Sequence, residues 1–99
     1  MPTSSALPAE LTIYAVGELR PAWLALLAAH SADGSAPLRL DAAAVDQVDA
    51  AGVQLLLSLA NTLARRSPPS ALLLDRPSEP LRQACQALGA ATLLQGEAA

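Results

Sequence analysis

The stretch LRLDAAAVDQVDAAGVQLLL, residues 38–57, decides the fold. It begins with Leu38 and Leu40 on either side of Arg39, an alternation typical of a short strand that ends near residue 42. A loop of small residues follows, and Asp49 then precedes a long pattern of apolar and polar residues at helical spacing. Strand, loop and helix in this order are the beginning of an α/β unit.

The helix predicted over residues 50–66 has the strongest periodicity in the chain. Asp49 is a favourable N-cap residue, and its charge suits the positive end of the helix dipole. At the other end, Arg65 and Arg66 complement the dipole, and two prolines at 68–69 stop the helix. The predicted apolar stripe consists of Val53, Leu56, Leu57, Ala60, Leu63 and Ala64, and the polar stripe of Gln54, Ser58, Asn61 and Arg65.

Upstream, we expect one strand and one helix. Residues 10–14 alternate polar and apolar side chains and are assigned to a strand, whereas residues 1–8 are expected to form a flexible N-terminus. A helix then runs through residue 29. Because proline is tolerated in a first turn, Pro21 places the regular start of this helix near residues 18–20. Its predicted apolar face consists of Leu19, Trp23, Leu26 and Leu27.

Downstream, the apolar run of residues 71–75 is typical of a buried parallel strand. Ser78 is positioned to cap a last helix, which ends near Gly89 and turns Leu81, Cys85 and Leu88 inward. Residues 92–94 are interpreted as an edge strand. The pattern predicts a single α/β domain over residues 9–95, with a small mixed sheet of four to five strands and about three helices packed against it.

The composition of the chain argues against several classes of function. The chain has 99 residues, 53% hydrophobic and 15% charged, with a net charge of −3, which argues against a nucleic-acid or membrane-headgroup surface. The single cysteine excludes an internal disulfide, and one cysteine with one histidine cannot supply a structural zinc site. The sequence has neither a signal-peptide pattern nor an apolar run of membrane-spanning length, so we expect a cytoplasmic protein without direct membrane insertion.

The sequence shows no clear arrangement of catalytic residues. His30, beside Ser31 and near Asp33, is interpreted as a solvated helix end, and Cys85 as a buried, inert thiol. Asp41, Asp46 and Asp49 could hold a divalent cation, but we favour a helix cap and solvated loop charges. The sequence contains no GxxxxGK[ST] or GxGxxG phosphate loop. We therefore expect no enzyme activity, no cofactor and no metal.

Residues 38–57 resemble the signature of the STAS domain (sulfate transporter and anti-sigma factor antagonist), a family that includes bacterial signalling regulators. Its pattern is approximately Asp-Leu-Ser-x-Val-x-x-Ile-Asp-[Ser/Thr/Ala]-[Ser/Ala]-Gly-Leu-x-x-Leu-Leu after a strand. The matching positions in this chain are Leu40, Asp41, Val45, Val48, Asp49, Gly52, Val53, Leu56 and Leu57. Residues 10–14 and 18–19 also resemble the opening of a branch of this family, and the likeness extends over about residues 9–94.

The resemblance implies a STAS-like fold and a non-enzymatic module for protein–protein interaction and regulation. It implies that the partner is an anti-sigma factor or a histidine-kinase-like ATPase. The partner-binding residues that it implies are Asp49, Ala50, Ala51, Gly52, Gln54 and Thr12. In regulated members, a serine or threonine just after the Asp accepts phosphate, but this chain has Ala50 and Ala51 there, so a phosphoacceptor is missing at the switch position.

Several alternatives stay open. The chain also resembles the small STAS subunit that docks on the ATPase of a lipid-transport ABC system, and stand-alone members associated with chemotaxis. A STAS domain that binds a nucleotide or another small ligand is a further possibility, as is a homodimer formed through Trp23 or residues 92–94. The small residues 50–52 are compatible with two roles, a platform for a partner or close packing against a neighbouring strand.

Overall fold

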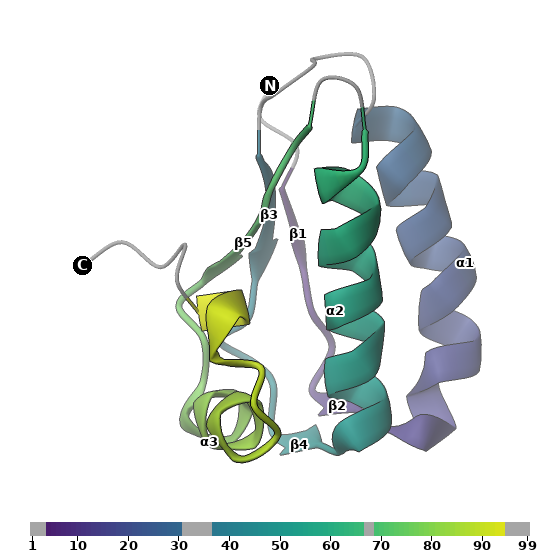
Figure 1. Cartoon of the computed structure of the whole chain (residues 1–99). Helices are drawn as coiled ribbons and strands as arrows, with labels where there is room; N and C mark the ends of the chain where they lie inside the picture. Colours follow the sequence, from purple (N-terminus) through teal and green to yellow (C-terminus); the bar gives the residue numbers. More distant parts are fainter. Residues whose placement is uncertain (1–3, 31–36, 67–68, 95–99) are drawn as a thin grey trace.

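The computed structural model describes residues 4–30, 37–66 and 69–94. These residues form a layer of parallel strands with α1 and α2 on one side of it (Figure 1). The elements in chain order are β1 (Ser4–Ala6), β2 (Glu10–Leu11), α1 (Ile13–His30), β3 (Leu38–Asp41), β4 (Gln47–Val48), α2 (Ala50–Ala64), β5 (Leu72–Asp75), α3 (Glu79–Ala87) and the 3₁₀ helix η2 (Ala91–Leu94). The predicted α/β class is confirmed.

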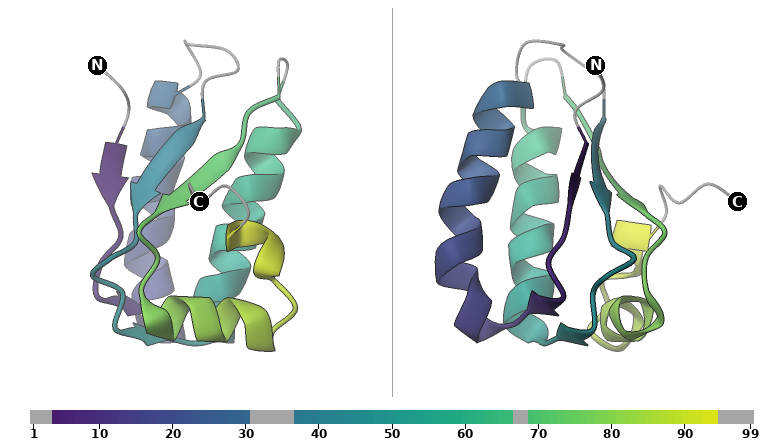
Figure 2. Two further views of the ribbon diagram at one scale, coloured as in Figure 1. Left: turned by 90° about the vertical axis from the view of Figure 1, so that its left-hand side faces the viewer. Right: turned by 180° about the vertical axis from the view of Figure 1, so that it is seen from behind.

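The main sheet has the strand order β1-β3-β5, and both pairs are parallel. Parallel neighbours need crossover connections, which α1 supplies between β1 and β3, and α2 between β3 and β5. Both helices cover the same face of the sheet (Figures 1 and 2). On that face, Leu38 and Leu40 of β3 lie beside Leu72 and Leu74 of β5, and all four leucines are buried.

A second, two-stranded parallel sheet joins β2 to β4. Each of these strands directly precedes one of the two long helices, so the pairing brings the starts of α1 and α2 to one end of the molecule. That end is also where the parallel strands β1, β3 and β5 terminate, at the bottom of Figure 1. The sequence pattern predicts one mixed sheet, whereas the strands of the described residues form two separate parallel sheets.

Helix α1 begins earlier than predicted. It starts at Ile13, not near residues 18–20, and the strand before it is limited to Glu10–Leu11. Pro21 therefore lies inside the helix and has no N–H to donate to the carbonyl of Gly17. The helix tolerates this defect because Trp23 and Leu27 are buried against the rest of the domain. The other two residues of the predicted apolar face, Leu19 and Leu26, are only half-buried.

Both ends of the chain differ from the sequence interpretation. Residues Ser4–Ala6, placed in a flexible segment, form β1, which pairs with β3 through its backbone. The next residue, Leu7, is buried and its N–H donates to the Asp41 carbonyl at 2.8 Å. At the other end, the expected edge strand at 92–94 is a 3₁₀ helix, in which Leu93 is buried, after a turn at Gly89 with φ 71°.

Two predicted helix faces need correction. In α2, Leu59 is buried, whereas Leu57 and Ala60 are only half-buried and Ala64 is exposed. The buried face is rotated because α2 packs against α1 as well as against the sheet. In α3, Leu81 and Cys85 are buried as predicted, but Leu88 is 49% exposed because the helix ends at residue 87.

The buried apolar side chains form one continuous core between the sheet and the helices.

The homodimer suggested by the sequence would use an exposed Trp23 or an edge strand at residues 92–94. Trp23 is only 6% exposed, and residues 92–94 form a 3₁₀ helix, so neither of these features is present in the described residues. None of the helices among these residues is long and apolar enough to span a membrane.

Candidate functional site

The structure brings the six candidate partner-binding residues to the end of the molecule where α1 and α2 begin (bottom of Figure 1). Thr12 immediately precedes α1 and Asp49 immediately precedes α2. The β2–β4 pairing holds these two positions together, and the Asp49 N–H adds a hydrogen bond to the Leu11 carbonyl at 3.1 Å. Residues far apart in the sequence therefore share one surface.

Asp49 caps both helices. Its Oδ1 accepts a hydrogen bond from the Gly52 N–H at 3.1 Å, the N-cap interaction within α2. Its Oδ2 accepts from the N–H of Ile13, the first residue of α1, at 3.0 Å. The bond from Ile13 is the largest cause that lowers the pKa of Asp49, and the helix-start N–H groups of Gly52 and Ala51 lower it further, against the effect of burial. The carboxylate is therefore held in its charged form.

Thr12 occupies the equivalent position at the start of α1. Its hydroxyl donates to Glu10 Oε2 at 2.5 Å and accepts from the Tyr14 N–H at 3.3 Å. Its carbonyl accepts from the N–H groups of Ala15 and of the following residue. Thr12 is half-buried, so its main contribution in the free protein is to fix the first turn of α1.

The small residues at the start of α2 have two different roles. Gly52 is buried, and a Cβ built on it would lie only 2.1 Å from the Leu11 carbonyl oxygen, so this residue packs against β2. Ala50 and Gln54 are exposed, and Ala51 is half-buried. Gly52 therefore has the close-packing role, whereas Ala50 and Gln54 are the residues exposed to a partner.

Two exposed apolar residues beside this surface were not identified from the sequence. Ile13 is 60% exposed and Tyr14 is 88% exposed, both in the first turn of α1. The alternation of residues 10–14 predicts a strand, so Ile13 and Tyr14 are not expected at the exposed start of a helix. The signal that could have found them is Thr12, because threonine is a favourable N-cap residue.

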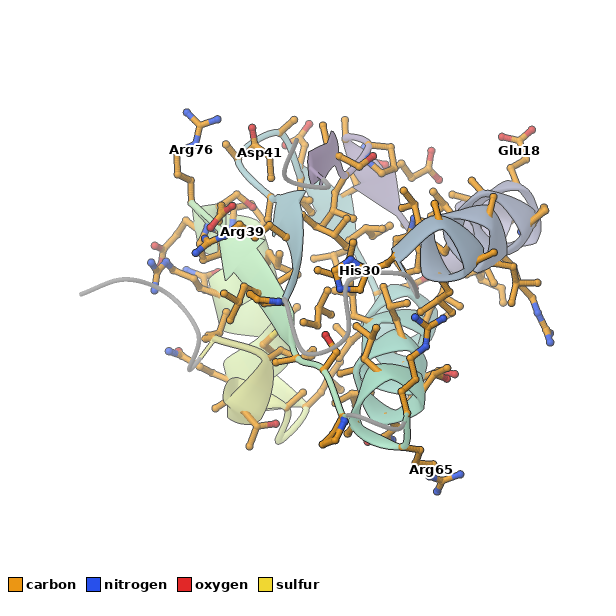
Figure 3. All side chains as sticks on the ribbon, turned by 90° about the horizontal axis from the view of Figure 1, so that it is seen from above. Glu18, His30, Arg39, Asp41, Arg65 and Arg76 are labelled. Atoms are coloured by element: carbon orange, nitrogen blue, oxygen red, sulfur yellow. The ribbon has the colours of Figure 1, made fainter. Side chains whose placement is uncertain are left out.

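A second polar cluster lies on the opposite face of the sheet, away from α1 and α2 (Figure 3). Arg39 pairs with Asp75 at 2.8 Å, and Arg76 pairs with Asp41. The Ala43 N–H and then Arg76 lower the pKa of Asp41. Arg76 has φ 52°, a conformation that non-glycine residues rarely adopt. These pairs are exposed, so each stabilises the fold only weakly.

Other candidates from the sequence do not form a catalytic or metal centre. His30 is 3% exposed rather than solvated, because this last residue of α1 packs against the segment before β5, with Nε2 3.4 Å from Ser70 Oγ. Ser31 and Asp33 lie outside the described residues. Cys85 is buried, which raises the pKa of its thiol. Within the described part of the chain, no three His, Cys, Asp or Glu side chains gather into a possible metal site.

These features define a small parallel α/β domain in which one aspartate joins the starts of two neighbouring helices. The family model described as "Mlab, STAS domain" matches residues 6–95, nearly the whole chain. The protein therefore belongs to the STAS domain family. Searches of curated proteins and of solved structures found no match.

Proposed function

We propose that this protein is a non-catalytic, cytoplasmic interaction module of the anti-sigma factor antagonist type. Its partner would bind to the helix-start surface, which we define as Thr12, Ile13, Tyr14, Ala50 and Gln54. The observation that carries the proposal is the exposure of Ile13 and Tyr14 beside the capped start of α2. A largely exposed tyrosine with an apolar neighbour is typical of the anchor residues of protein interfaces.

The hydrogen bonds around Asp49 support this role. They connect α1 to α2 at the point where the exposed residues lie, so the surface is fixed before a partner arrives. A preorganised surface loses less conformational freedom on binding than a flexible one. Asp49 itself is half-buried and has both carboxylate oxygens hydrogen-bonded within the domain, which suits a positioning role rather than direct contact.

The alanines at positions 50 and 51 bear on how partner binding could be regulated. A phosphate at this position would add charge next to Asp49 and would oppose a partner through repulsion and desolvation. Neither alanine has a hydroxyl that could carry phosphate. We therefore propose that partner binding is not switched by phosphorylation at this position.

The partner that we propose first is an anti-sigma factor or a histidine-kinase-like ATPase. The second candidate is the ATPase of a lipid-transport ABC system. Both would use the same surface, so they are distinguished by which protein binds rather than by where it binds.

The test is affinity purification of the tagged protein from its host, followed by measurement of binding to each purified candidate. Ala50→Glu places a charge on the exposed first turn of α2, and Tyr14→Ala removes the most exposed aromatic side chain. Ala25→Glu, at an exposed position further along α1, is the matched control. We expect both surface variants to weaken binding at least tenfold and the control to bind like the wild type.

Equal binding by all variants, with unchanged circular dichroism, would exclude this surface. Recovery of an ABC ATPase alone would assign the protein to the transporter branch. Calorimetry with ATP and Mg²⁺ tests the small-ligand alternative, since saturable heat at micromolar affinity would favour a nucleotide-binding domain over a module that binds only proteins.

A further inference from the structure

A groove with a volume of about 270 Å³ runs between α1 and α2. Its floor is formed by Trp23 and Leu27 of α1 and Leu59 of α2, all of which are buried. Its rim carries exposed side chains, among them Arg20, Leu24 and Ser58. The groove therefore combines an apolar floor with polar groups near solvent, the composition that small-molecule sites generally have.

The charge of the groove is opposite to that of the whole chain. The protein has a net charge of −3, yet Arg20 is the one charged residue that lines the groove among the described residues. Glu18, the acid nearest to Arg20 in the sequence, points away from α2 (Figure 3). An anionic group bound near Arg20 would therefore meet a guanidinium with five N–H donors and no carboxylate in the groove lining.

The dimensions favour a small, elongated ligand. The lining residues of α1 run from Val16 to Leu27, a length of about 16 Å at the helical rise. A protein partner is a poorer fit, since a stable interface engages about 20–30 residues on each side.

We propose that this groove binds a single-chain amphiphilic anion, such as a medium-chain carboxylate. The apolar chain would lie on Trp23, Leu27 and Leu59, and the carboxylate would accept hydrogen bonds from Arg20. Leu24, which is 55% exposed at the rim, would close over the chain. The site shares no residue with the helix-start surface, so the inference stands independently of the proposed function.

The chain provides its own reporter, because Trp23 is its single tryptophan and lies on the groove floor. The test is a titration with decanoate below its micellar concentration, followed by Trp23 fluorescence and by calorimetry. Decan-1-ol tests the need for the charge, and acetate tests the need for the chain. We expect saturable binding of decanoate, at least tenfold weaker binding of decanol, and no measurable binding of acetate.

Variants assign the binding to the groove. Arg20→Gln removes the cation and Leu24→Asp places an acid on the rim; both positions are exposed, so the fold is expected to survive. Arg65→Gln, an exposed arginine just beyond the end of α2 that does not line the groove, is the matched control. We expect at least tenfold weaker decanoate binding for the first two variants and unchanged binding for the control. Absence of decanoate binding by both methods, equal binding of decanol, or equal effects of Arg20→Gln and Arg65→Gln would overturn the proposal.

Discussion

The carboxylate of Asp49, the residue before α2, accepts a hydrogen bond from the backbone N–H of Ile13, the first residue of α1. The first N–H groups of a helix have no partner within that helix, and a carboxylate near them is also favoured by the helix dipole. One side chain therefore satisfies donors at the starts of two helices, and the bond to Ile13 joins residues 36 positions apart in the sequence. This contact connects the fold directly to the candidate partner-binding surface.

The charge of Asp49 is expected to make the stability of the domain dependent on pH. Its folded pKa is lowered, so the stabilisation is fully present above the ordinary aspartate pKa of about 4 and is lost as the pH falls through the lower folded value. Asp49→Asn should lower the melting temperature at pH 7, because the amide NH₂ that replaces one carboxylate oxygen cannot accept from the backbone N–H that faces it.

The check is the melting temperature measured from neutral pH down to strongly acidic pH. The difference between wild type and Asp49→Asn should shrink as the pH decreases below about 4. The control is Asp46→Asn, at an exposed position between β3 and β4. This variant should melt close to the wild type at neutral pH. A difference for Asp49→Asn that stays constant over the whole range would contradict the role given to the charge.

Gly17 and Gly52, which lie in described helices, are predicted to respond oppositely to alanine. A Cβ at Gly52 would lie 2.1 Å from the Leu11 carbonyl oxygen, so Gly52→Ala must separate α2 from β2 and should destabilise by about 1–3 kcal/mol or more. A Cβ at Gly17 would have nothing within 4 Å, and this residue lies inside α1, so Gly17→Ala should stabilise by about 0.5–1 kcal/mol. Urea unfolding of both variants measures the two effects, and equal shifts would refute the close contact at Gly52.

Much of the fold could be predicted because the long elements carry their own patterns. Asp49 and the apolar residues after it define α2, and the apolar run before Asp75 defines β5. Ser4–Ala6 could not be assigned to a strand, because these small residues have no apolar alternation and are held by backbone pairing with β3. Such pairing depends on a distant segment and leaves no local signature.

The candidate site was predictable only in part for the same reason. The sequence identifies Asp49 as the cap of its own helix, which is a local interaction. Its bond to Ile13 depends on the pairing of β2 with β4, so no sequence window around either residue contains it. The burial of His30 is also a tertiary effect, since it depends on the segment that contains Ser70.

The C-terminal helix provides a test of the corrected packing. Leu81 is fully buried, so Leu81→Ala should destabilise by about 2–5 kcal/mol through lost burial and a residual cavity. Leu88, which the helical spacing placed inward, is 49% exposed, and Leu88→Ala should change stability by less than about 1 kcal/mol. Chemical denaturation of the two variants gives the comparison. A large loss of stability in Leu88→Ala would show that this side chain packs inward after all.

The two arginines at the end of α2 should contribute differently to the contact between the long helices. Arg66 donates from Nη2 to the Leu27 carbonyl in the last part of α1, whereas Arg65 is exposed and points away from the domain (Figure 3). A hydrogen bond to a charged group contributes about 1.5–3 kcal/mol, so Arg66→Ala should destabilise by a substantial part of that amount. Arg65→Ala should have an effect within about 0.5 kcal/mol, as surface substitutions usually do. Hydrogen exchange can locate the effect, because loss of the Arg66 bond should increase exchange in the last turns of α1 first. Equal stability of the two variants would show that the dipole interaction expected from both arginines, rather than this single bond, accounts for their contribution.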